Sequence, residues 1–96
     1  MKKKPISVDE LRWACRYSKT DEPDKFGRWA RQCFFKDLHI AWVRRDEFKG
    51  VIKFCVSTHF PVNGNDMPHY CANFDTFKGA KECVEFLWKE FRELCR

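Results

Sequence analysis

The chain has 96 residues, a net charge of +5, 44% hydrophobic residues and 17% aromatic residues. This length predicts one domain, residues 1–96, with a single hydrophobic core and little room for the buried cleft of an enzyme. Four glycines and four prolines are too few for a low-complexity chain, and no apolar run is long enough to cross a bilayer. We therefore expect a folded, cytoplasmic protein that is not an enzyme, uses no cofactor or small-molecule substrate and does not enter a membrane.

The N-terminal third of the chain, residues 1–37, is predicted to be helical. Ser7 and Glu10 have the spacing of a capping box, which predicts a helix over residues 8–18. In residues 23–36 the apolar positions recur at helical spacing after Pro23, which favours a second helix. Alternation from Trp29 to Phe35 leaves a strand as the alternative for this segment.

Residues 38–96 are predicted to form three strands and a helix. Alternating apolar residues over 38–43 and 51–56, joined by a turn at 46–50, predict a β-hairpin. A long loop then leads to a third strand over 69–74. Asp75 or Thr76 can cap a helix with one long apolar stripe. The expected fold is therefore α+β, with a helical N-terminal third, a three-stranded antiparallel sheet and a long C-terminal helix packed on the sheet.

The positive charge of the chain is concentrated between Lys25 and Lys53. This stretch carries eight lysines and arginines against three acids, so its surplus of five equals the net charge of the protein. Aromatic residues such as Trp42 and Phe48 are interleaved with the cations. Cations mixed with aromatic groups suit a polyanion such as a nucleic acid, whereas the alternative is a solvated surface that keeps the protein soluble.

Residues 43–51 (VRRDEFKGV) and 73–80 (NFDTFKGA) resemble the plant AP2-type DNA-binding domain and its relatives in phage and transposon integrases. The resemblance covers residues 38–87. It implies a three-stranded sheet packed against one helix, with DNA bound through the strands. It also implies that Arg44 and Arg45 enter the major groove beside Trp42.

From these observations we expect a small non-enzymatic module that binds nucleic acid through a basic, aromatic-containing sheet surface. The predicted contact residues are Arg44, Arg45, Lys49, Lys53, Trp42, Arg28 and Arg31. The alternative is a phage or mobile-element inhibitor, similar in role to an anti-CRISPR protein, that binds a host nucleoprotein complex and blocks its nucleic-acid binding. The candidate protein-interface residues are Trp13, Tyr17 and Phe48, because exposed aromatic side chains anchor protein interfaces.

Two cysteines and two histidines flank the long loop and form a candidate metal site. Cys55, His59, His69 and Cys71 could converge on a tetrahedral zinc site if the neighbouring strands pair. Their spacing matches no standard zinc finger, so we expect no metal. With no secretory signal in the sequence, we also expect the six cysteines to be reduced.

Overall fold

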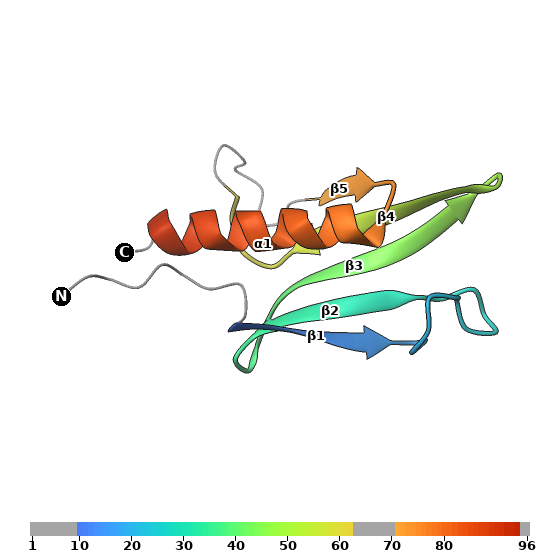
Figure 1. Cartoon of the computed structure of the whole chain (residues 1–96), viewed down its shortest axis with the longest axis horizontal. Coiled ribbons are helices and arrows are strands. Elements are labelled where there is room, and N and C mark those ends of the chain that lie inside the picture. Colours follow the sequence, from blue (N-terminus) through green and yellow to red (C-terminus); the bar gives the residue numbers. More distant parts are fainter. Residues whose placement is uncertain (1–9, 63–70, 95–96) are drawn as a thin grey trace.

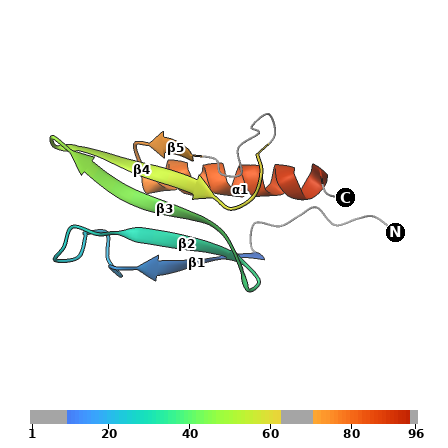
Figure 2. The same ribbon diagram turned by 180° about the vertical axis from the view of Figure 1, so that it is seen from behind.

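The computed structural model describes residues 10–62 and 71–94. Within these residues the chain forms a five-stranded antiparallel sheet and one α-helix (Figures 1 and 2). The strands lie side by side in chain order, so each strand pairs with its neighbour in the sequence. The elements are β1 (Leu11–Arg16), β2 (Ala30–Phe35), β3 (Leu38–Phe48), β4 (Val51–Thr58), β5 (Cys71–Phe74) and α1 (Phe77–Leu94). No helix in the described residues is both long enough and apolar enough to span a membrane.

The predicted helical N-terminal third and three-stranded sheet are wrong, because residues 11–16 form an additional strand, β1. Leu11 and Trp13 alternate with Arg12, and the register pairs Leu11 with Phe35 and Trp13 with Cys33. Cross-strand packing of this apolar side outweighs the local helix signal of the capping box. Propensity is a weak prior where such tertiary contacts exist.

The second predicted helix is also wrong, and the strand alternative is correct for β2. Before this strand the chain forms a turn and not a helix. The Asp24 Oδ1 atom accepts hydrogen bonds from the backbone amides of Phe26 and Arg28, at 2.9 and 2.8 Å. Gly27 has a φ of 77°, a left-handed conformation that glycine adopts without steric cost. These local bonds compete with a helix and redirect the chain into β2.

The predicted hairpin is confirmed and is longer than the sequence pattern indicates. β3 and β4 pair from Ala41 opposite Thr58 to Phe48 opposite Val51. The two turn residues, Lys49 and Gly50, have φ values of 53° and 80°. Positive φ at both central positions gives a two-residue turn whose twist matches the right-handed twist of the flanking strands. β3 and β4 can therefore stay paired up to the turn.

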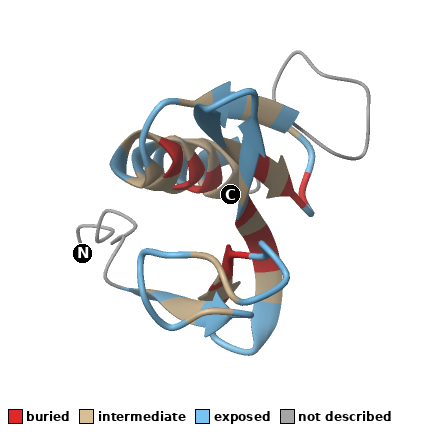
Figure 3. Cartoon of the chain, turned by 90° about the vertical axis from the view of Figure 1, so that its right-hand side faces the viewer, coloured by how far each residue is buried: buried red, intermediate tan, exposed pale blue. Residues whose placement is uncertain are grey.

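The predicted C-terminal helix is confirmed, and it covers one face of the sheet (Figure 3). Thr76 caps it, since its Oγ1 accepts a hydrogen bond of 3.0 Å from the amide of Gly79. Trp88 packs in the core, 5.2 Å from the ring of Phe35 and 5.1 Å from that of Phe60. The remaining fully buried core side chains include Cys33, Val43, Val56, Ala80 and Val84. The core therefore lies between α1 and the sheet.

Candidate nucleic-acid interface

The sheet has one covered face and one open face. α1 contacts β3, β4 and β5 on the covered face, and no described element lies across the other (Figure 3). Residues paired across strands share a face, so the register assigns each strand residue to one side. The cross-strand rows on the open face include Arg12, Phe34, His39; then Ala14, Gln32, Trp42, Ser57, Cys71; then Arg16, Ala30, Arg44, Cys55, Asn73; then Asp46, Lys53.

Positive charge dominates the open face. Its strand residues carry four cations, Arg12, Arg16, Arg44 and Lys53, against the one acid Asp46. Arg44 Nε lies 3.0 Å from Asp46 Oδ1, and Lys53 pairs with Asp75 at the end of β5. Among the described residues, Arg12 and Arg16 have no carboxylate partner. The described strand residues of this face therefore carry a net positive charge, to which β1 contributes two cations.

Aromatic rings form a ladder across the open face. The Arg12 guanidinium lies 4.5 Å from the Phe34 ring centroid, and the rings of Phe34 and His39 stack at 5.0 Å. The His39 ring meets the His59 ring at 4.7 Å, just beyond the end of β4. The Nε2 atom of His39 is buried and has no hydrogen-bond partner among the described residues. This aromatic ladder joins β1 to the end of β4.

Trp42 forms a shared wall between two shallow hollows. The first hollow, of about 330 Å³, is lined by Arg16, Tyr17, Gln32, His39, Trp42 and His59. The second, of about 290 Å³, lies where β3 continues past the start of β2, and its lining includes Tyr17, Arg28, Trp42 and Arg44 together with Trp29 and Arg45. Two guanidinium groups lie near the centroid of the Tyr17 ring, that of Arg16 at 5.2 Å and that of Arg28 at 4.7 Å. Both hollows thus combine an aromatic wall with cations.

The thiol beside Arg44 does not cancel the positive charge of the open face. Burial raises the pKa of Cys55, although the nearby Arg44 acts in the opposite direction. Cys55 is therefore an uncharged thiol at neutral pH. A hydrogen bond from Arg44 to Asp46 raises the pKa of the guanidinium, so Arg44 remains a fixed cation.

No family model, curated protein or solved structure matches this chain. The AP2-type resemblance stays a prediction. It implied that Arg44 and Arg45 act on the same side of the sheet as Trp42. In the structure Trp42 and Arg44 lie on the open face, whereas Arg45 pairs with Phe54 on the covered face.

The predicted contact residues are divided between the two faces. Trp42, Arg44 and Lys53 lie together on the open face. The side chain of Arg45 is only 12% exposed, and its Nη1 atom lies 3.9 Å from Glu47 Oε2. Lys49 is at the hairpin tip, where its ammonium group lies 5.4 Å from the Phe48 ring centroid. The open face and the tip are thus separate parts of the predicted basic hairpin.

Two other predicted contact residues, Arg28 and Arg31, are occupied by internal partners. Arg31 is 8% exposed. Its Nη1 donates to the carbonyls of Ser18 and Ala30, at 2.8 and 2.9 Å, and its Nη2 donates to that of Thr20 at 2.7 Å. Arg28 is exposed and pairs with Asp24 at 3.1 Å. Arg31 therefore fixes the β1–β2 loop instead of presenting charge at the surface.

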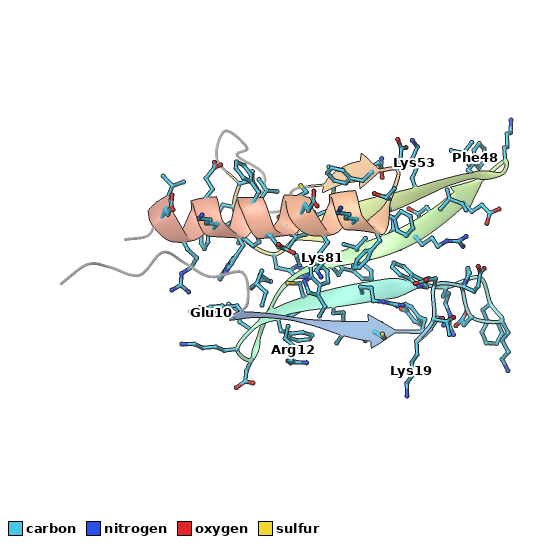
Figure 4. All side chains as sticks on the ribbon, in the orientation of Figure 1. Glu10, Arg12, Lys19, Phe48, Lys53 and Lys81 are labelled. Atoms are coloured by element: carbon cyan, nitrogen blue, oxygen red, sulfur yellow. The ribbon has the colours of Figure 1, made fainter. Side chains whose placement is uncertain are left out.

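The predicted protein-interface residues do not form one patch. Trp13 is half-buried on the covered face, with its ring 5.6 Å from that of Phe77. Tyr17 lies after the end of β1 and is 44% exposed. Phe48 is 73% exposed at the far end of the β3–β4 hairpin (Figure 4). Only Tyr17 and Phe48 are thus accessible as the sequence predicted.

The candidate metal ligands are only partly described. Cys55 and Cys71 share the open face of β4 and β5, and His59 lies at the end of the aromatic ladder. His69 lies outside the described residues. Within residues 10–62 and 71–94, no three histidine, cysteine or acidic side chains are grouped closely enough to hold a metal ion.

Sequence reasoning missed the contribution of β1 to the open face. Arg12 points away from α1 (Figure 4), and Arg16 lies on the same side of the strand. The signal was the alternation of residues 11–16, LRWACR, in which two arginines alternate with Leu11, Trp13 and Cys15. Interpreting this segment as a helix concealed the alternation.

Proposed function

We propose that the protein binds nucleic acid through the open face of its sheet. The supporting observation is that four cations and the aromatic ladder share a face whose described strand residues include one acid. Such a surface offers guanidinium groups to phosphates and aromatic rings to bases. The proposal places the contact on all strands from β1 to β4, and not on the hairpin alone.

The two arginines of β1 are the cations best placed to bind phosphate. Arg12 and Arg16 have no ion pair among the described residues, so no carboxylate of residues 10–62 and 71–94 competes with a phosphate for them. Arg44 donates hydrogen bonds to Asp46, so a phosphate has to share Arg44 with this carboxylate or displace the carboxylate. We therefore expect Arg12 and Arg16 to contribute more to affinity than Arg44. The binding should weaken as salt rises, because each neutralised phosphate releases condensed counterions.

A matched pair of charge reversals tests this proposal. The double variant R12E/R16E changes the charge of the open face, and K78E/K89E makes the same change on exposed positions of α1. Affinity for a labelled oligonucleotide is measured by fluorescence anisotropy from about 50 to 200 mM salt. R12E/R16E should lower affinity by more than about tenfold. It should also reduce the slope of log affinity against log salt by the equivalent of about two phosphate contacts. Equal affinities of both variants and the parent protein would contradict the proposal.

A protein partner is the second candidate function, and one observation favours it. The tip of the β3–β4 hairpin and the β1–β2 loop lie at the same end of the molecule (Figure 1), and they expose large apolar side chains, with Phe48 at 73% and Phe26 at 68%. Exposed aromatic groups of this kind anchor protein interfaces. We propose for this case an inhibitor that binds a host nucleoprotein complex. The test is capture of a partner protein from a nuclease-treated lysate. Loss of capture in F48A, together with unchanged capture in R12E/R16E, would support this function over nucleic-acid binding.

A further inference from the structure

We infer that the nucleic acid bound by the open face is single-stranded, with unpaired bases entering the two hollows that Trp42 separates. This inference rests on the proposed function and names its substrate class. It depends on three features of the open face: the depth at which Trp42 lies, the composition of the hollows, and the distribution of the cations.

The position of Trp42 suits a base and not the outside of a duplex. Trp42 is half-buried in the central strand, between Gln32 and Ser57 of the neighbouring strands. The longer, more exposed side chains of Arg16 and Arg44 belong to the adjacent row. Both arginines therefore lie on one side of the indole, where a base stacked on the ring can place its phosphate beside them. Bases in a duplex present only their edges, whereas an unpaired base presents its whole face for stacking.

The first hollow offers groups that hydrogen-bond to base edges. Gln32 supplies an amide with both donors and an acceptor, and the imidazole rings of His39 and His59 line the same hollow. Arg16 stands at the same hollow as a cation for the adjoining phosphate. An aromatic wall, an amide and a cation together provide stacking, edge contacts and charge for one nucleotide.

The second hollow repeats this combination on the other side of the Trp42 side chain. Its cations are Arg28, Arg44 and Arg45, each beside an acidic side chain, and one of these acids, Asp46, offers carboxylate oxygens to a base amino group. Tyr17 lines both hollows, so two aromatic side chains separate neighbouring sites. Two successive nucleotides can thus be held with one base in each hollow, which a base-paired strand cannot do without opening.

The cations are distributed as a path for a flexible strand. Arg12 and Arg16 lie on β1, Arg44 lies on β3 and Lys53 lies on β4, so positive charge crosses the open face from one edge strand. A positively charged track combined with stacking platforms is the usual chemistry of single-strand binding and tolerates different sequences. This surface therefore predicts weak dependence on base identity.

The test compares single-stranded and duplex oligonucleotides at one salt concentration. The probes are a labelled poly-dT strand, a labelled poly-U strand and a hairpin duplex of similar charge, and the readout is fluorescence anisotropy. We expect at least one single strand to bind about tenfold or more tightly than the duplex. Tighter binding of poly-dT or of poly-U supports the inference equally and identifies the source as DNA or RNA.

Variants of Trp42 provide the second part of the test. W42A should lower single-strand affinity by about tenfold, because each base stacked on an aromatic ring contributes on this scale. W42F keeps an aromatic face and should retain most of the affinity, and thermal melting confirms that both variants fold. Duplex binding as tight as single-strand binding, or unchanged single-strand affinity in W42A, would overturn the inference and leave the proposed function in place if R12E/R16E still weakens binding. Absence of binding to all three probes would overturn both.

Discussion

Replacing the buried Arg31 separates structural from functional arginines in this protein. The Arg31 guanidinium donates three hydrogen bonds to backbone carbonyls and stacks 4.1 Å from the Trp29 ring. In R31M the aliphatic part is kept and all three bonds are lost. A hydrogen bond to a charged group contributes about 1.5–3 kcal/mol, but the carbonyls of Ser18 and Thr20 are close to solvent and can be rehydrated. We therefore expect R31M to lower the free energy of unfolding by about 3 kcal/mol.

The measurement is urea unfolding followed by circular dichroism, with R28M as the matched control. Arg28 is exposed and its ion pair with Asp24 is on the surface, so R28M should cost no more than about 1 kcal/mol. Oligonucleotide binding of R31M is measured well below its unfolding midpoint and should equal that of the parent protein. A loss of stability below about 0.5 kcal/mol in R31M would refute the structural role. Normal stability with lost binding would instead place Arg31 in the interface.

Three further predictions concern the core, the helix cap and the hairpin turn. Burial raises the pKa of Cys33 to about 12, so its contribution to stability is complete below the unfolded pKa near 9 and is lost as pH rises toward 12. Unfolding measured from pH 8 to pH 11 should therefore show a smaller loss of stability in C33A than in the parent protein. T76A removes the acceptor of the Gly79 amide and should cost about 1 kcal/mol in thermal unfolding, with T76S retaining most of the stability. G50A places a Cβ at a φ of 80° and should destabilise the hairpin by about 1 kcal/mol in urea unfolding, and an unchanged midpoint would contradict the turn assignment.

The C-terminal part of the fold was predictable because its signals are local and agree with one another. The apolar stripe of α1 and its Thr76 cap both indicate a helix that begins near residue 77. The alternation in β3 and β4 and the glycine of their turn both indicate a hairpin. Where propensity, periodicity and turn chemistry point to the same structure, sequence reasoning is dependable.

The N-terminal part was not predictable because its local signals conflict. Apolar residues at 26, 29, 30, 33 and 34 have helical spacing, yet residues 30–35 form β2. The stability of β1 comes from its register with β2, which pairs Trp13 with Cys33 across a loop of 13 residues between Arg16 and Ala30. Such non-local pairing leaves little trace in a short window of sequence.

The candidate site was predictable only in its central strand. Trp42 and Arg44 were identified from the basic stretch, but their partners on the same face depend on the register of β1 and β2. Charge concentration along the sequence could not show that neighbouring residues such as Arg44 and Arg45 face opposite sides of a strand. The pleat of the sheet decides this, because adjacent side chains alternate between its faces.

The order of the elements along the chain has a consequence for synthesis on the ribosome. Each strand pairs with the strand before it, so the sheet can assemble one hairpin at a time as residues emerge. The covering helix is the last described element, and until it emerges the apolar side chains of Val43 and Val56 have no layer above them. The nascent sheet is therefore most prone to aggregation after its strands have emerged and before α1 packs on them, and its need for chaperones should be greatest at that stage.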